Sequence, residues 1–134
     1  MVPRPPQQPG VVTLPSARPA PEVLDRLSAL AAARGLTIFA RIDFAREAAA
    51  VGREARPMAQ LVFGGPRGGS PVLAAAPLAG LDLPPRALAW TDAEGHTWLS
   101  YADPAALQAK HGLTATQVAG LHEVHELCQA AVGE

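Results

Sequence analysis

The chain of 134 residues carries a formal net charge of −1, and 49% of its residues are hydrophobic while 17% are charged. This length suits a single domain with one hydrophobic core. No uninterrupted apolar run reaches the roughly 20 residues that a membrane-spanning helix needs. The near-zero charge and the few aromatic residues also argue against a nucleic-acid-binding protein. We therefore expect a soluble domain with no membrane and no nucleic acid among its partners.

The amino-terminal segment is rich in proline, which disfavours helices and central strands. Residues 1–10 are predicted to form a disordered tail, and residues 11–134 to form a single domain. The tail lacks the apolar core of a secretory signal, and the chain has one cysteine, Cys128, so no internal disulfide can form. These features favour a cytoplasmic location. Residues 11–14 are mostly β-branched and predict a short strand at a sheet edge.

A helix and two strands are predicted next. Residues 22–34 place apolar side chains at helical spacing. Residues 36–43 alternate between apolar and polar, as a half-buried strand does. The expected apolar face of this strand consists of Leu36, Ile38, Ala40 and Ile42. After a short helix capped by Asp43, residues 58–63 are predicted to be a buried strand.

The glycine-rich segment after this strand, residues 64–70, is the most distinctive stretch. Ser70 followed by Pro71 has the pattern of a helix N-cap with proline at the first helical position. A helix N-terminus offers free N–H groups and a positive dipole end to an anion, and glycines let a ligand approach the backbone. We therefore predict an anion-binding loop. The expected ligand contacts are Gly64, Gly65, Arg67, Gly68, Gly69 and Ser70, with Asp82 and Arg56.

A purely structural interpretation of these glycines stays open. Gly64 and Gly69 have the spacing of two glycines in the P-loop pattern, but Ser70 stands where that pattern requires lysine. The segment is therefore not a nucleotide fingerprint. It can equally serve to turn the chain between a strand and a short helix at residues 70–76.

Residues 86–101 predict a β-hairpin around the turn Asp92–Gly95, preceded by an extended stretch at residues 80–85. Alternation is expected to place Trp90 and Trp98 on one face of the hairpin. That face would be either the aromatic wall of a pocket or ordinary packing against the helices.

Two helices are predicted to close the chain. Asp103 and Pro104 form a cap-plus-proline start to a helix that runs to His111. Residues 114–117 have capping-box spacing, which opens a last helix to about Ala131. Together these elements indicate a compact α+β domain in which an antiparallel or mixed sheet packs against helices.

Histidines and one carboxylate are further candidates for chemistry. His122 and His125 lie one turn apart on the last helix and could ligate a metal or a haem iron, but two ligands do not make a site. We therefore predict no metal and no cofactor. His96 and His111 are isolated in the sequence. Asp82, flanked by apolar residues and followed by two prolines, has no structural role that the sequence reveals.

Five separated motifs occur in order along the chain. They are Ala31-Ala32-Ala33-Arg34-Gly35-Leu36-Thr37-Ile38-Phe39-Ala40-Arg41-Ile42-Asp43, Arg56-Pro57, Phe63-Gly64-Gly65-Pro66, Gly80-Leu81-Asp82-Leu83-Pro84 and Trp98-Leu99-Ser100-Tyr101. In this order they resemble the domain-of-unknown-function family 302, over about residues 11–113. The resemblance implies a small α+β domain that forms a homodimer, and it supplies no reaction. Family members often carry asparagine where Gly65 stands.

The leading functional hypothesis is a non-catalytic module that binds a small anionic ligand at residues 64–70 and acts as a homodimer. One alternative is a structural or interaction protein whose dimer surface is its function. Another is an enzyme or a haem- or metal-binding protein that uses the histidines. A binding module should have a concave pocket at the loop, whereas an assembly protein should expose a broad apolar face.

Overall fold

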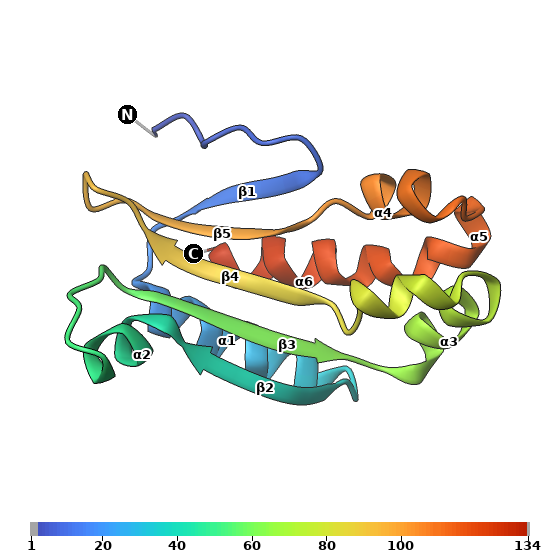
Figure 1. Ribbon diagram of the computed structural model, residues 1–134, viewed down its shortest axis with the longest axis horizontal. Helices are drawn as coiled ribbons and strands as arrows, with labels where there is room; N and C mark the ends of the chain where they lie inside the picture. The colour runs from blue at the N-terminus through green and yellow to red at the C-terminus, as the bar shows by residue number, and fades with distance from the viewer. Residues whose placement is uncertain (1–2, 134) are drawn as a thin grey trace.

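The computed structural model describes residues 3–133, and its centre is a five-stranded antiparallel sheet in the order β1-β5-β4-β3-β2. Figure 1 shows the strands side by side, with β1 and β2 at the two edges. The strands are β1 (Val11–Ser16), β2 (Thr37–Asp43), β3 (Met58–Gly64), β4 (Arg86–Thr91) and β5 (Thr97–Ala102). The predicted α+β class is confirmed, and the sheet is antiparallel.

Two helices cover one face of this sheet, α1 (Ala20–Ala33) and α6 (His122–Val132), both of which lie behind the strands in Figure 1. Their apolar stripes interleave with alternate residues of the strands to form the main core. Its largest fully buried members include Leu24, Leu27, Leu61, Phe63, Leu99 and Leu127. Within the described residues, no helix combines the length and the apolar character that crossing a membrane requires.

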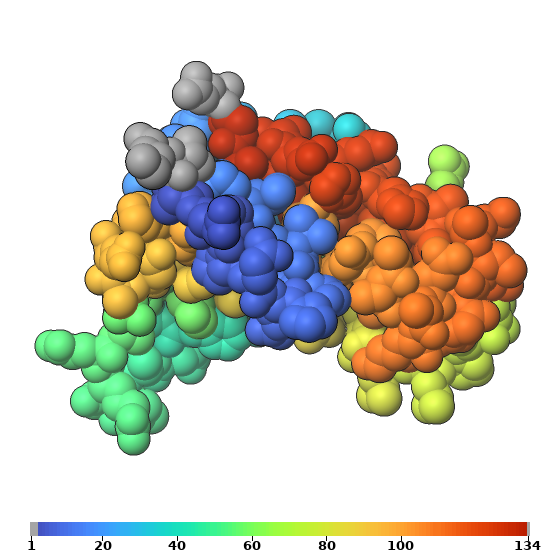
Figure 2. Space-filling model, turned by 90° about the horizontal axis from the view of Figure 1, so that it is seen from above, coloured from blue at the N-terminus to red at the C-terminus, as the bar shows by residue number. Residues whose placement is uncertain are grey.

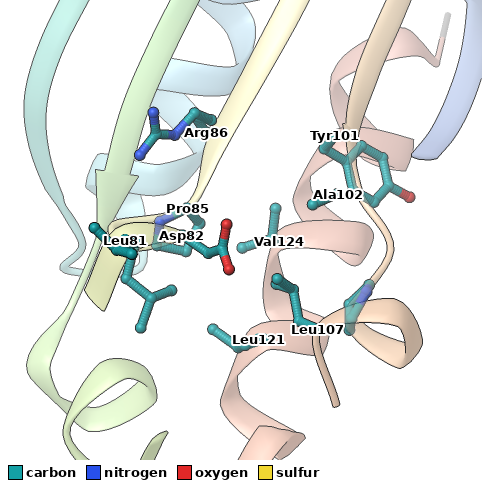
Figure 3. Close-up of a pocket in the computed structure, with 11 residues that line it drawn as sticks. Leu81, Asp82, Pro85, Arg86, Tyr101, Ala102, Leu107, Leu121 and Val124 are labelled. Carbon is teal, nitrogen blue, oxygen red and sulfur yellow. The ribbon is translucent and has the colours of Figure 1, made fainter. Parts of the chain in front are cut away.

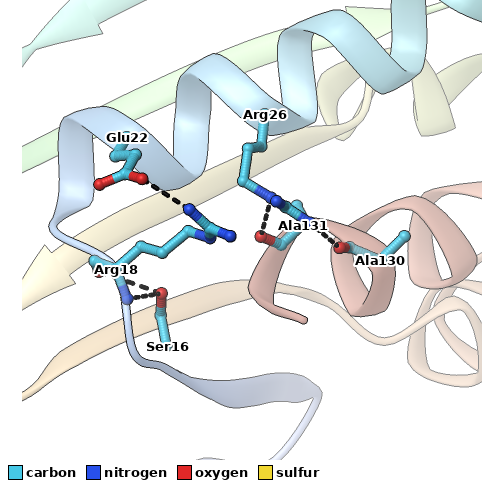
Figure 4. Close-up of polar contacts among 6 residues, drawn as sticks. All are labelled: Ser16, Arg18, Glu22, Arg26, Ala130 and Ala131. Atoms are coloured by element: carbon cyan, nitrogen blue, oxygen red, sulfur yellow. Dashed lines mark hydrogen bonds and ion pairs between the residues drawn. The ribbon is translucent and has the colours of Figure 1, made fainter. Parts of the chain in front are cut away.

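Two arginines make polar contacts with helices: Arg26 of α1 contacts the C-terminal end of α6, and Arg18, before α1, contacts the first turn of α1 (Figure 4). The guanidinium of Arg26 donates to the carbonyl oxygens of Ala130 and Ala131, each at 3.1 Å, at the end of α6. Arg18 pairs with Glu22 one turn along at 2.6 Å. A cation at a helix C-terminus satisfies carbonyl groups that have no partner within the helix, so Arg26 fixes α6 against α1.

The other face of the sheet carries apolar side chains as well. Register places Leu88 opposite Ser100 and Trp90 opposite Trp98, so the hairpin and the shared tryptophan face are confirmed. This face points away from α1 and α6, so of the two alternatives for the tryptophans, packing against these helices is wrong. In Figure 2, which shows the molecule from above, the outline is indented on this side, between a green lobe after α2 (Phe44–Ala50) and a yellow-to-orange lobe. We call this side of the sheet, which carries Met58, Val62, Leu88 and Trp90, the open sheet face.

Strand β2 departs from the predicted alternation. A β-bulge lies between Ile38 and Ala40. Ile38 pairs with Phe63 and packs against the main core under α1 and α6. Ala40, in contrast, pairs with Val62 on the open sheet face. One extra residue in a strand reverses which face the following side chains take. The single apolar face expected from the sequence is therefore divided between the two sides of the sheet.

The helix that follows β3 begins earlier than the sequence suggested. Helix α3 is Pro66–Ala75, with Gly65 as its N-cap and Pro66 in its first turn. Ser70 and Pro71 lie inside this helix, so the predicted N-cap at Ser70 is wrong. Pro66 meets the same steric condition as Pro71, because a proline in the first turn lacks only an N–H that has no acceptor there. The predicted extended stretch after it contains the end of a 3₁₀ helix, η1 (Pro77–Leu81).

The C-terminal helices begin as predicted. Asp103 caps α4 (Pro104–His111), and Gly112 ends it with φ +62°. The Thr114 capping box opens α5 (Ala115–Val118). The continuous last helix is wrong, because a 3₁₀ turn, η2 (Ala119–Leu121), separates α5 from α6.

Residues 3–8, within the predicted tail, have no regular secondary structure, and the first two residues of that tail lie outside the described range. Gly10 accepts a hydrogen bond from the Asp103 N–H at 2.9 Å, which ties the start of β1 to the start of α4. The disorder of the tail stays a prediction.

Candidate functional site

The glycine-rich segment is mostly helix, and its backbone groups are used within that helix. The N–H groups of Gly68 and Gly69 both donate to the carbonyl oxygen of Gly65 at 3.2 Å. A Cβ on Gly68 would lie 3.5 Å from the backbone of Gly120, and a Cβ on Gly120 would lie 2.6 Å from Gly68. These glycines therefore let α3 and η2 approach each other, which favours the structural interpretation of the segment.

The two arginines predicted to act with this segment lie far from each other. Arg67 is in the first turn of α3, after β3 has ended, whereas Arg56 precedes β3. At roughly 3.3 Å per residue, the ends of this strand are about 20 Å apart. Arg56 instead donates through Nε to the carbonyl oxygen of Thr91 at 3.2 Å. Arg56 therefore does not lie beside residues 64–70.

A cavity of about 200 Å³ lies elsewhere, where β4 and β5 diverge beyond the Ala87–Tyr101 pair. It is open to solvent on one side and is lined by the end of η1 and the turn after it, by the ends of β4 and β5, and by α4, η2 and α6 (Figure 3). The lining residues are Leu81, Asp82, Leu83, Pro85, Arg86, Tyr101, Ala102, Pro104, Leu107, Leu121 and Val124. We call this cavity the β4–β5 pocket.

Asp82 carries a charge into this mainly apolar space. Figure 3 shows its carboxylate directed from the η1 side toward Val124 on α6. His111 Nε2 lies 2.6 Å from Asp82 Oδ2, and Lys110 Nζ lies 3.1 Å from the same oxygen. The hydrogen bonds from His111 and then from Lys110 lower the pKa of Asp82 below its ordinary value of 3.8. The carboxylate is therefore ionised at neutral pH. Its structural role, which the sequence did not reveal, is to pair with His111 and Lys110 at the end of α4.

Two other polar residues of the lining direct their polar groups elsewhere. The guanidinium of Arg86 extends away from Asp82 and Val124 in Figure 3. The hydroxyl of Tyr101 is hydrogen bonded to Nδ1 of His125 on α6, and burial raises the pKa of this tyrosine. Tyr101 thus offers mainly its ring to the β4–β5 pocket.

The histidines are distributed over separate parts of the molecule. His96 lies near Asp92 in the hairpin turn, His111 contacts Asp82, and His125 contacts Tyr101. Among the residues that the structure describes, no three potential metal ligands of the His, Cys, Asp and Glu types come together. Cys128 is buried in the main core, and burial raises the pKa of its thiol to about 12.

Sequence reasoning identified Asp82 but missed the rest of the β4–β5 pocket. Leu107, Leu121 and Val124 have the periodicity of helix core positions, and periodicity does not distinguish a filled core from the wall of a cavity. Pairing of Asp82 with the C-terminal turn of α4 depends on tertiary structure. The one local signal was a carboxylate between leucines with no evident cap role.

The fold and the pocket define a small α+β domain with helices on one face of an antiparallel sheet. A model of the family described as domain of unknown function DUF302 matches residues 12–133, and the chain belongs to this family. The family therefore extends through the last helix, beyond the stretch that the resemblance suggested.

A crystal structure of an uncharacterized conserved DUF302 protein from Bacillus stearothermophilus has the same fold. It superposes with a TM-score of 0.76 at 17% identity, covering 93% of this chain and 97% of that one. Identity at this level shows the fold alone.

Two curated relatives are named fluoride-specific ion channel FluC 1. The protein from Brucella suis biovar 1 (strain 1330) is 38% identical over 104 residues, which is 78% of this chain and 41% of that protein. The protein from Brucella abortus biovar 1 (strain 9-941) is also 38% identical over 104 residues, or 38% of its length. The chain thus matches about two fifths of the length of each of these relatives.

Proposed function

We propose that the protein is a non-catalytic module that binds a small molecule in the β4–β5 pocket. The observation that carries this proposal is the cavity itself, which is concave, mostly apolar and supplied with one directed carboxylate. Ligand sites combine these features, although most are larger, at about 300–1,000 Å³. A cavity of about 200 Å³ is suited to a ligand the size of a six-membered ring.

The rim of the pocket supports the same proposal. Leu81 is 80% exposed at the end of η1 and lines the cavity, so it lies where an entering apolar ligand would cover it. Leu78, in the same 3₁₀ helix, is similarly exposed at 74% but does not line the cavity. The two leucines form a matched pair for an experiment.

Cyclohexanol binding, measured by thermal-shift titration, tests the proposal with this pair. Leu81→Ser is expected to weaken binding about three- to tenfold, because it removes apolar contact area at the rim. Leu78→Ser should bind like the wild type. If cyclohexanol stabilises none of the proteins, or if both variants bind as tightly as the wild type, the pocket is not the site.

The anion site at residues 64–70 stays a prediction with a narrower basis, because the N–H groups of Gly68 and Gly69 in the first turn of α3 already donate to the carbonyl oxygen of Gly65. The names of the Brucella relatives refer to fluoride. In the β4–β5 pocket the directed group is an ionised carboxylate, which repels a small anion. We therefore do not extend fluoride binding to this pocket.

We propose assembly as a second candidate function, because the open sheet face carries several half-buried apolar side chains. Its half-buried members include Met58, Val62, Leu88 and Trp90. Both indole N–H groups of the hairpin are satisfied internally, Trp90 by Ser100 and Trp98 by Asp92, each at 2.9 Å. Half-exposed apolar side chains beside satisfied indole N–H groups are suited to a protein interface. A homodimer that packs two such faces together is the simplest assembly.

Light scattering coupled to size-exclusion chromatography tests the homodimer. We expect the wild type to have the mass of two chains and Leu88→Lys to have the mass of one, because a lysine buried in the interface would lose its hydration without gaining a partner. Leu73→Lys, at an exposed position of α3, is the control and should stay dimeric. A monomeric wild type, or a dimeric Leu88→Lys protein, would count against the open sheet face as the interface.

A further inference from the structure

We propose that the ligand of the β4–β5 pocket is a small apolar molecule with a basic amine, whose ammonium group binds Asp82. This inference rests on the proposed function and names the class of ligand. It differs from the anion expected from the sequence, because the charge that the fold directs into the cavity is negative.

The placement of Asp82 is the first argument. Its carboxylate is directed into the cavity, whose lining includes the apolar side chains of Leu81, Leu121 and Val124, while His111 and Lys110 pair with it. A charged group in apolar surroundings costs free energy unless it is paired. The guanidinium of Arg86 is directed away. A ligand that placed an ammonium group on the inner side of Asp82 would therefore add a partner to a charge that is already partly shielded from water.

The two present partners of Asp82 differ in how firmly they are held. The His111 side chain is only 10% exposed and reaches Oδ2 at 2.6 Å. The Lys110 side chain is 62% exposed and contacts the carboxylate at 3.1 and 3.4 Å from the solvent side. An exposed lysine pair of this kind contributes little to stability. Lys110 thus shows that an ammonium fits this carboxylate, and its exposed side chain can give way to a second ammonium.

The remaining walls select the rest of the ligand. Leu107 of α4 and Leu121 of η2 line the cavity from the same packed cluster, and Ala102 lines it at the end of β5. These side chains offer contacts to carbon atoms. The matching ligand is a compact hydrocarbon of about six carbons with one amine, rather than an extended polyamine.

Isothermal titration at neutral pH compares three probes that share a ring: cyclohexylamine, cyclohexanol and cyclohexanecarboxylate. We expect cyclohexylamine to bind about tenfold more tightly than cyclohexanol, as a charge-assisted hydrogen bond allows. The carboxylate should bind more weakly than the alcohol. Binding of both amine and alcohol with equal affinity would overturn the amine inference and leave the proposed function intact. If no probe binds, both are overturned.

Three variants identify the group responsible. Asp82→Asn should lower the affinity for cyclohexylamine about tenfold and change that for cyclohexanol less than twofold. Lys110→Gln should raise the affinity for the amine two- to threefold, because it removes the competing ammonium. Asp25→Asn, which removes a surface carboxylate paired with Arg41, is the matched control and should change neither affinity. Should Asp82→Asn fail to fold, the Lys110→Gln result decides, since unchanged or weaker amine binding overturns the inference.

Discussion

Asp82 is the residue on which the candidate site depends. It follows η1, and its carboxylate joins this short helix to the C-terminal turn of α4 through His111 and Lys110. Cations in the last turn of a helix are favoured by the negative end of the helix dipole, so both partners are well placed where they are. One carboxylate thereby stabilises the rim of the β4–β5 pocket and presents charge to its interior.

The lowered pKa of Asp82 predicts how stability depends on pH. Because the folded-state pKa lies below 3.8, the pair with His111 and Lys110 contributes stability above that pH, and this contribution is lost as the pH falls through the lowered value. At pH 5.5 we expect the free energy of unfolding of the wild type to exceed that of Asp82→Asn by about 0.5–1 kcal/mol. The difference is small because the Asp82 side chain keeps 27% of its surface exposed.

Urea unfolding of both proteins at several pH values between 5.5 and 3 measures this difference. It should shrink as the pH falls below about 4. A difference that stays constant over this range would show that the ionised carboxylate contributes nothing to the fold.

At the scale of elements, the contact between α3 and η2 explains the glycine-rich segment. Gly120 faces Gly68 so closely that a Cβ on Gly120 would lie 2.6 Å from the Gly68 Cα. The 3₁₀ turn that interrupts the last helix carries Gly120 to this contact. Two segments that are distant in sequence are thus joined backbone to backbone, and side chains of Val72, Val118 and Leu121 fill the smaller core around them.

Alanine substitutions test this close approach. Gly120→Ala is expected to destabilise the protein by about 1–3 kcal/mol, because the added methyl forces α3 and η2 apart. Gly69→Ala is the control within the same glycine-rich segment. A Cβ there meets no described atom within 4 Å, and alanine in a helix is favoured over glycine by about 0.5–1 kcal/mol. Thermal unfolding should show opposite shifts, and equal shifts would refute the contact.

Elements marked by local chemistry could be predicted from the sequence. The caps at Asp43, Asp103 and Thr114 depend on side chains that bond to the backbone two or three residues away, and all three are confirmed. The hairpin likewise follows from alternation and its turn. The start of α3 could not be decided locally, because Pro66 and Pro71 satisfy the same rule for a first helical turn. The bulge in β2 and the Gly68–Gly120 contact depend on the packed sheet and helices.

The same distinction applies to the candidate site. Asp82 stood out because local structure did not explain it, whereas the pocket that gives it meaning is assembled from η1, β4, β5, α4 and α6. Gly64, whose φ is +156°, and Gly65 pack against Pro85 and Leu36. Arg56 lies at the other end of β3. A cavity formed by residues this far apart in the chain leaves no continuous pattern in the sequence.

At the scale of the whole molecule, the proposed pocket and the proposed interface adjoin at Arg86, which lines the pocket and pairs with Val62 of the open sheet face, but their other named members differ. The β4–β5 pocket lies at the end of the sheet where α4 follows β5. The open sheet face lies on the side opposite α1 and α6, which Figure 1 shows behind the strands. Leu88→Lys therefore changes the open sheet face without altering a residue that lines the β4–β5 pocket. Ligand binding and assembly can be tested separately in one protein.

The most direct test of the account is a map of backbone amide chemical shifts in ¹⁵N-labelled protein titrated with cyclohexanol, the neutral probe. We predict that the largest changes fall at residues that line the β4–β5 pocket, among them Leu81, Ala102, Leu107 and Val124. Residues 64–70 should change less. Changes confined to residues 64–70, or spread over the open sheet face, would contradict the claim that this pocket is the ligand site.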